Sequence, residues 1–263
     1  MSPLLQRVAT HEGVVVLAEG QPPSGPAVTA LPSGDAALVG VATGAAIGGT
    51  ATVVMLSGRR SLDEAQEALV AASQCAQSGG LQAPLVVCVP LGAQDMLDSD
   101  RTWPNAAVAR DGGVAADLMD VALRKPEFSV LMVPRVETAV GVPLAEGTHQ
   151  VLRQGDHVVL VATGTSVVEA LQAASVLEHE GITVEVVDAI RPDSEHLCGY
   201  LAQRAAHVGR LVFVHAPGEA SLLRELQRAV TRSSFWTLES PPTLTGGEQV
   251  IDVCRDAAHD RLE

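Results

Sequence analysis

Residues 158–188, VVLVATGTSVVEALQAASVLEHEGITVEVVD, decide the fold class of this chain. The apolar, β-branched run from Val158 to Ala162 predicts a buried strand. The turn Gly164-Thr165-Ser166 leads into a helical stretch that ends at Gly181. A second β-branched run, Thr183 to Val187, predicts the next strand. A strand, a helix and a strand in this order form a βαβ unit, which places both strands in a parallel sheet.

The same alternation continues on both sides of this stretch. It predicts further strands at Val14–Leu17, Thr52–Leu56, Leu85–Val89, Ser129–Val133, Arg210–His215 and Ser234–Leu238. Helices are predicted between them, among them Ala36–Gly48 and Leu62–Gln77, the second with Ser61 as N-cap. We therefore predict an α/β protein of two domains, each a mostly parallel sheet flanked by helices. The domains comprise residues 1–135 and 157–263, and residues 136–156 form the linker.

Composition excludes several classes of function. The chain has 263 residues, of which 47% are hydrophobic, so it is too apolar for a disordered protein. Its formal net charge of −14 disfavours sequence-independent binding to nucleic acid and binding to an anionic membrane. The four cysteines lie far apart, which favours reduced thiols over a zinc site or a disulfide scaffold. Because the first residues also lack a secretory signal, we expect a cytoplasmic protein.

The second domain resembles a known family through six segments that occur in order. They are Val151–Asp156, Val158–Ser166, Glu169–Ala174, Glu180–Asp188, Arg191-Pro192-Asp193 and Arg210–His215. Together they resemble the carboxy-terminal domain of transketolases and of 2-oxoacid dehydrogenase E1 component β subunits. The resemblance covers roughly residues 151–230.

The first domain is similar to the pyrimidine-binding domain of the same β subunits. The similarity lies in Pro32–Ala46, in Ser78–Val87 and in Asp111–Val133. The whole chain therefore resembles a shortened β subunit, with departures from the family pattern at the cofactor site.

The resemblance implies a function and partners. A β-like subunit of this kind belongs to a two-component, thiamine-diphosphate-dependent enzyme of the 2-oxoacid dehydrogenase or transketolase type. Its reaction would be 2-oxoacid decarboxylation with acyl transfer, or ketol transfer. In the family an α subunit holds the diphosphate and Mg²⁺, so the resemblance implies an α-like partner and no metal site in this chain. It also implies a homodimer within an α2β2 assembly.

The resemblance places the family's cofactor-activating glutamate at Asp35. In the family this carboxylate hydrogen-bonds N1′ of the aminopyrimidine and favours the imino tautomer that deprotonates thiazolium C2. Leu56, Ser57 and Arg60 are the further cofactor-binding positions, in the stretch where the family carries a stacking aromatic ring. Three departures are visible: Asp is one methylene shorter than Glu, no aromatic residue precedes Trp103, and the family's histidine has no counterpart in residues 92–105.

Structural interpretations stand beside these functional ones. Asp35 would also serve as the N-cap of a helix beginning at Ala36. The turn at Gly164-Thr165-Ser166 could hold an anion, although a plain strand-to-helix turn explains it equally. One helix face carries three glycines, which favours close packing at a subunit interface: Gly40, Gly44 and Gly48. For the whole chain, the alternative to a catalytic subunit is a non-catalytic scaffold or regulatory subunit of such an assembly.

Overall fold

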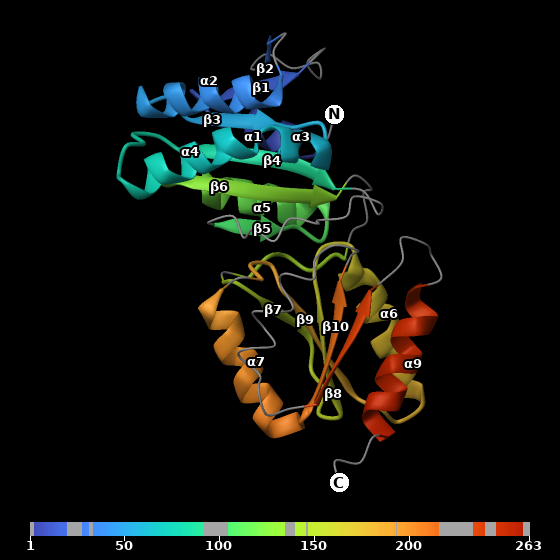
Figure 1. Ribbon diagram of the computed structural model, residues 1–263. Coiled ribbons are helices and arrows are strands. Elements are labelled where there is room, and N and C mark those ends of the chain that lie inside the picture. Colours follow the sequence, from blue (N-terminus) through green and yellow to red (C-terminus); the bar gives the residue numbers. More distant parts are fainter. Residues whose placement is uncertain are drawn as a thin grey trace. The chain divides into compact units, whose positions relative to one another are not determined.

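The computed structural model describes residues 3–19, 28–31, 34–91, 105–134, 140–145, 147–192, 194–215, 234–239 and 246–259. These residues form two compact units (Figure 1). The first contains the described residues up to Pro134, and the second contains those from Val140 onward. Both units are mostly parallel sheets flanked by helices, so the predicted α/β class is confirmed.

The first unit is built on a six-stranded sheet with the order β2-β1-β3-β4-β6-β5. All its strand pairs are parallel. In chain order the strands are β1 (Val15–Glu19), β2 (Val28–Leu31), β3 (Thr52–Met55), β4 (Leu85–Leu91), β5 (Ala106–Val108) and β6 (Phe128–Pro134). The central strands are buried on both faces, which explains their almost continuous apolar sequences.

Helices cover both faces of this sheet. They are α1 (Pro3–Val8), α2 (Asp35–Ile47), α3 (Arg59–Glu64), α4 (Gln66–Gln77) and α5 (Gly112–Ala122). The crossovers through α2 and α4 run in one direction along the sheet, whereas the crossover through α5 runs back. Because parallel crossovers are right-handed, α2 and α4 lie on one face and α5 lies on the other. Helix α1 packs against α5.

A polar cluster fastens α1 to α5. The carboxylate of Asp120 on α5 accepts a hydrogen bond from Arg7 Nε at 2.8 Å, and it lies 2.9 Å from His11 Nε2. Burial opposes ionisation of this carboxyl group, but the hydrogen bonds from Arg7 and His11 outweigh burial and lower the pKa of Asp120.

This lowered pKa gives the stability of the first unit a pH dependence. A carboxyl group whose pKa is lower in the folded state than in the unfolded state stabilises the fold at pH values above its ordinary pKa, here 3.8. This contribution is lost as the pH falls through the pKa of the folded state. We therefore expect Asp120→Asn to lower the melting temperature at pH 7 by about 2 °C, because the pair is near the surface. The difference from wild type should shrink as the pH falls below 3.8 and through the lowered pKa of Asp120 in the folded state. A difference that is independent of pH in thermal melts contradicts this account.

The second unit is built on a five-stranded sheet with the order β11-β10-β8-β9-β7. The strands are β7 (Gln150–Arg153), β8 (Val158–Ala162), β9 (Val184–Asp188), β10 (Arg210–His215) and β11 (Ser234–Glu239). All pairs are parallel except the pair of β7 with β9 at the edge. The helices are α6 (Ser166–His179), α7 (Glu195–Val208) and α9 (Gly246–His259).

Two apolar clusters hold the second sheet between its helices. One face packs on α6 and α9 through small and aliphatic side chains, among them Leu160, Ala173 and Val250. The other face packs on α7 through residues such as Leu201 and Phe213. The predicted βαβ unit at residues 158–188 is therefore the centre of this core, with β8 buried along its whole length.

Gly155, in the second unit, has no room for a side chain. A Cβ at this residue would lie 2.3 Å from the carbonyl carbon of Val184. We expect Gly155→Ala to destabilise the second unit by about 1–3 kcal/mol in denaturant unfolding, because backbone must move to admit the methyl group. The control is Gly199→Ala on α7, where a Cβ meets no atom within 4 Å. That variant should be neutral or stabilising by up to about 1 kcal/mol, so an equal loss in both variants contradicts the steric explanation.

Three details differ from the sequence prediction. Ser61 is not an N-cap: it lies inside α3, and its hydroxyl pairs with that of Ser57 at 2.6 Å. Strand β2 was not predicted, and the predicted linker contains strand β7. Both strands are short edge strands, whose sequences carry little periodicity.

Candidate functional site

The carboxyl edge of the first sheet has a point at which the strand order reverses. From β1 the chain moves to β2 on one side, and then α2 carries it back to β3 on the other side of β1. Loops that follow neighbouring strands diverge at such a point, and open α/β sheets bind their ligands there. The residues that follow this edge are the start of α2 and the segment after β3 (Figure 1).

Asp35 lies at this edge as the first residue of α2. Its residue surface is only 4% exposed, and its Oδ1 atom has no hydrogen-bond partner among the described residues. A buried carboxylate oxygen without a donor costs free energy in the isolated chain. The same atom is a ready acceptor for an N–H or O–H group of a ligand, and the helix N-terminus favours the negative charge.

The alternative interpretation of Asp35 as an N-cap is wrong. The N-cap of α2 is Gly34, which has an extended backbone and no side-chain cap, and Asp35 lies in the first turn of the helix. The Asp35 side chain therefore does not bond to the first backbone N–H groups in the way a capping residue does. Its buried position calls for another explanation.

The other predicted cofactor positions follow β3. Leu56 is 2% exposed, and its backbone N–H donates to the carbonyl of Cys88 at 3.0 Å. Ser57 is exposed, and its hydroxyl is held by the buried Ser61. Leu56 and Ser57 thus come to the same edge of the sheet as Asp35, since β3 is the strand next to β1 in this parallel sheet.

Arg60, unlike Leu56, lies in solvent. Its side chain is 93% exposed, and its Nε donates to Glu64 at 2.9 Å across one turn of α3. Because this ion pair lies in solvent, it stabilises the helix only slightly. The cofactor-binding roles of Leu56, Ser57 and Arg60 remain predictions.

Sequence reasoning missed a buried charged pair at the carboxyl end of β5. Arg110 is fully buried, and its Nε lies 3.7 Å from a carboxylate oxygen of Asp111. Asp111 is the N-cap of α5, where it accepts from the backbone N–H of Val114 at 2.8 Å. An Asp before a helical run is a capping signal that the sequence offers. Burial of the arginine depends on the tertiary structure and left no local pattern.

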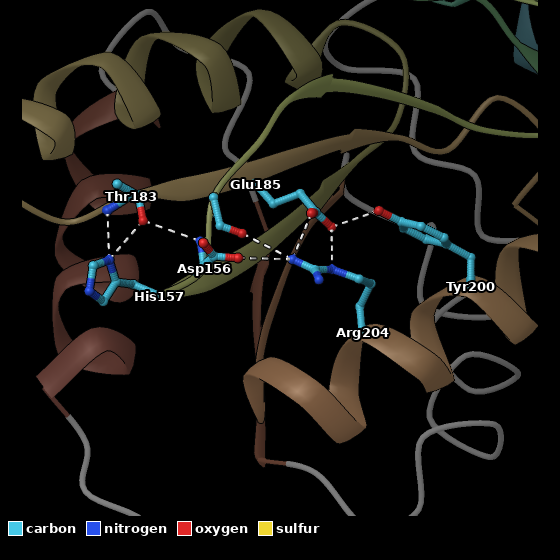
Figure 2. A network of polar contacts seen from close by, with 7 residues as sticks. Asp156, His157, Thr183, Glu185, Tyr200 and Arg204 are labelled. Atoms are coloured by element: carbon cyan, nitrogen blue, oxygen red, sulfur yellow. Dashed lines mark hydrogen bonds and ion pairs between the residues drawn. The ribbon is translucent and has the colours of Figure 1, made fainter.

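The second unit contains a larger polar network around Glu185 (Figure 2). Glu185 on β9 is 1% exposed and is bound by two groups of α7: Tyr200 donates to it at 2.8 Å, and Arg204 Nε donates at 3.0 Å. Arg204 also donates to the carbonyl of Gly155 at 3.0 Å and lies 3.8 Å from Asp156. Burial, followed by the hydrogen bond to Glu185, raises the pKa of Tyr200 to about 12.

The partners within this network identify its role. Every charged group in it has a partner of opposite charge, and the contacts join α7 to β9 and to the segment before β8. Because the buried Glu185 is bound by both Tyr200 and Arg204, its contacts position elements of the fold. We therefore assign it to the stability of the second unit.

The turn at Gly164-Thr165-Ser166 and the end of β10 add no functional group to the site among the described side chains. At Gly164-Thr165-Ser166 the backbone makes a turn, with Ser166 N–H bonded to the carbonyl of Thr163 at 3.1 Å. The side chain of His215, at the end of β10, lies outside the described residues. Among the described residues no group of three His, Cys, Asp or Glu side chains could hold a metal ion. No helix in the described ranges is long and apolar enough to cross a bilayer.

Comparisons with known proteins identify the second unit. Residues 147–260 match the family model of the transketolase C-terminal domain. The 1-deoxy-D-xylulose-5-phosphate synthase of Crocosphaera subtropica is 39% identical over 90 residues, which are 34% of this chain and 14% of that enzyme. The corresponding enzyme of Magnetococcus marinus is 41% identical over 85 residues, 29% of this chain and 13% of that enzyme. The chain thus spans about a seventh of the length of these curated relatives.

Solved structures share the fold over nearly the whole chain. One is described as "Split gene transketolase, inactive beta4 tetramer"; it covers 97% of this chain and 95% of its own, with a TM-score of 0.76 and 17% identity. A transketolase variant from Pichia stipitis covers 94% of this chain and 43% of its own, with a TM-score of 0.68 and 14% identity. The transketolase of Campylobacter jejuni covers 94% of this chain and 42% of its own, with a TM-score of 0.66 and 14% identity.

The two-unit α/β architecture is that of the transketolase fold, in which both units of this chain have a counterpart. Residues 147–260 match the transketolase C-terminal domain, and the described units share their fold with transketolase structures. The resemblance of the second unit to the transketolase C-terminal domain, found in the sequence, is thereby confirmed.

Proposed function

We propose that the chain is the β-like subunit of a two-component, thiamine-diphosphate-dependent enzyme of the 2-oxoacid dehydrogenase or transketolase type. In this proposal an α-like chain holds the diphosphate and Mg²⁺, and the two chains form an α2β2 assembly. The observation that carries the proposal is the buried Oδ1 of Asp35, which has no hydrogen-bond partner in the described chain and lies where the strand order reverses.

The extent of the structural similarity supports a second component. The chain covers 43% and 42% of two transketolases, whereas it covers 95% of a structure described as a split-gene transketolase. The proposal assigns the parts of a full transketolase that this chain does not cover to the α-like chain. The tetramer named for the split-gene protein supports self-association of this chain as well.

Asp35 fits the pyrimidine end of thiamine diphosphate. Its Oδ1 is buried and free to accept a hydrogen bond from a protonated ring nitrogen, and the start of α2 keeps the carboxylate at the sheet edge. The exposed hydroxyl of Ser57, held by Ser61, would contact the same ligand. The bound cofactor supplies the nucleophilic carbon for decarboxylation or ketol transfer. The task of this chain is to accept the hydrogen bond and to exclude water from the ring.

The test is reconstitution of activity from two chains. This chain is co-expressed with the product of its neighbouring gene, and consumption of 2-oxoacids is followed with thiamine diphosphate and Mg²⁺. We expect turnover only when both chains are present. Glu67→Gln, at an exposed position on α4, serves as the control for replacing a carboxylate and should leave turnover unchanged. Absence of a stable complex between the two chains contradicts the proposal.

A non-catalytic scaffold is the second candidate. It is favoured by the absence of aromatic residues before Trp103, because no ring of the first unit up to that point can stack on the pyrimidine. A scaffold forms the complex but binds no cofactor through Asp35. Complex formation without turnover, and with cofactor affinity unaffected by Asp35→Ala, would establish this alternative.

A further inference from the structure

The segment of residues 140–149, which leads into β7, lies at the surface of the second unit. None of its described residues is buried, and the apolar Val142 is 39% exposed. Segments of this kind open locally at a much lower free-energy cost than buried strands such as β8. A change in a few contacts therefore decides whether the segment stays in place.

Polar contacts fasten this segment to β7 and to the turn after β9. The side-chain amide of Gln150 donates to the carbonyl of Pro143 at 3.1 Å and accepts from the N–H of Ala145 at 3.4 Å. The backbone N–H of Arg191, which follows β9, donates to the carbonyl of Thr148 at 2.8 Å. The Arg191 N–H therefore reports directly whether the end of the segment is in place.

His149, the last residue of the segment, makes a ring contact with α7. Its ring centroid lies 4.6 Å from that of Tyr200, and the two ring planes are inclined by 35°. This separation is typical of aromatic pairs. Tyr200 is itself fixed, because its hydroxyl donates to the buried Glu185 at 2.8 Å (Figure 2). The contact thus ties the end of the segment to a fixed side chain of α7.

The surroundings of His149 oppose a positive charge on its ring. Burial lowers the pKa of His149 below its ordinary value of 6.5, and the charge of His196, one turn before Tyr200 on α7, lowers it further. The end of β9 adds the buried Asp188 and, after it, Arg191, which carry charges of opposite sign. The neutral ring is therefore the form that fits against α7.

We propose that His149 is a pH-sensitive latch, whose neutral ring holds the segment of residues 140–149 on α7 and whose protonation releases it. A histidine whose pKa is lowered in the closed arrangement stabilises that arrangement above pH 6.5. The contribution is lost as the pH falls below 6.5 and through the lowered pKa. The latch makes the attachment of this segment respond to acidification, and it does not depend on the cofactor proposal.

Hydrogen exchange of the full-length chain at pH 7.5 and pH 5.0, corrected for the intrinsic effect of pH on exchange, tests the latch. The reporter is the backbone N–H of Arg191, which is bonded to the segment. We expect its protection to fall at least about threefold at pH 5.0, because burial and a neighbouring like charge both oppose the protonated ring. The amides of β8 should keep their protection, since this strand is buried along its whole length.

Two variants of His149 separate titration from packing. His149→Phe keeps a ring on Tyr200 but cannot take up a proton, so it should protect the Arg191 N–H equally at both pH values. His149→Ala removes the ring and should give low protection at both. The matched control is His207→Phe, at an exposed position in the last turn of α7, and it should respond to pH like wild type.

A second measurement follows the ring contact itself. Tyr200 is the only tyrosine of the chain, so ¹³C-labelled tyrosine gives ring signals of this residue alone in NMR spectra. The signals should shift in wild type with a midpoint below pH 6.5, and they should not shift in His149→Phe. His196→Asn should reduce the loss of protection at pH 5.0, because one of the two like charges is gone.

Three results would overturn the proposal. Equal protection of the Arg191 N–H at both pH values, with shifted Tyr200 signals, would show that the protonated ring stays on Tyr200 by cation–π attraction. A pH response that persists in His149→Phe would assign the response to another group. Parallel loss of protection in β8 at pH 5.0 would show that the second unit opens as a whole and has no separate latch.

Discussion

Arg204→Ala is expected to destabilise the second unit by about 3–5 kcal/mol. The substitution leaves Glu185, which is 1% exposed, buried without its cation, and it also removes the donor to the carbonyl of Gly155. Tyr200 continues to donate to Glu185, but one neutral hydroxyl cannot replace a guanidinium. Denaturant unfolding of the second unit, followed by far-UV circular dichroism, measures the loss.

Two comparisons make this prediction specific. Arg255→Ala removes an arginine of the same unit whose pair with Glu180 is partly exposed, so it should have a much smaller effect. Combining Arg204→Ala with Glu185→Gln should recover part of the lost stability, because the uncompensated charge is gone. Equal effects of Arg204→Ala and Arg255→Ala, or no recovery in the double variant, would show that the buried ion pair does not fasten α7 to β9.

Asp35→Ala is expected to change stability and activity in opposite directions. In the isolated chain the variant should unfold with a free energy about 1–2 kcal/mol higher than wild type, because a buried oxygen without a partner is removed. In the assembled enzyme it should lower turnover at least about 100-fold, because the acceptor for the cofactor ring is lost. Melting curves of the isolated chain and turnover of the complex provide the two measurements.

The opposite signs exclude a trivial loss of structure as the cause of lost activity. A variant that is less stable and inactive would assign Asp35 to the core of the fold. Asp35→Glu is the conservative companion: it retains a carboxylate, restores the longer side chain that the resemblance implies and should retain activity. If Asp35→Ala turns over like wild type, Asp35 has no part in the reaction.

Much of the fold was predictable because its strands are buried on both faces. Residues 158–162 are continuously apolar, residues 183–187 are β-branched except for Glu185, and the glycine between helix and strand marks the boundary. The short edge strands β2 and β7 were missed because each pairs with a neighbouring strand on one side only and has only four residues. Ser61 has the sequence of a capping box, yet the chain already becomes helical at Arg59, so tertiary context overrode the local signal.

The candidate site was predictable only in part, and for a different reason. Family resemblance directed attention to Asp35, but its burial with an oxygen that lacks a partner emerged only from the three-dimensional structure. The partners of the buried Glu185 are 15 and 19 residues away in sequence, and no local periodicity indicates such pairings. The spacing of Gly40, Gly44 and Gly48 predicted a face of small residues on α2. The sequence could not show that a Cβ at Gly40 or Gly44 would meet no atom within 4 Å.

Titration of the assembled two-chain complex with thiamine diphosphate, in the presence of Mg²⁺ and followed by calorimetry, tests the account most directly. The account predicts that thiamine diphosphate binds the complex containing the wild-type chain with micromolar affinity. The complex containing Asp35→Glu should bind it with similar affinity, and the complex containing Asp35→Ala should bind it at least about tenfold more weakly. Equal affinity of wild type and Asp35→Ala, or no binding to a complex that forms normally, would contradict the claim that this carboxylate contacts the cofactor.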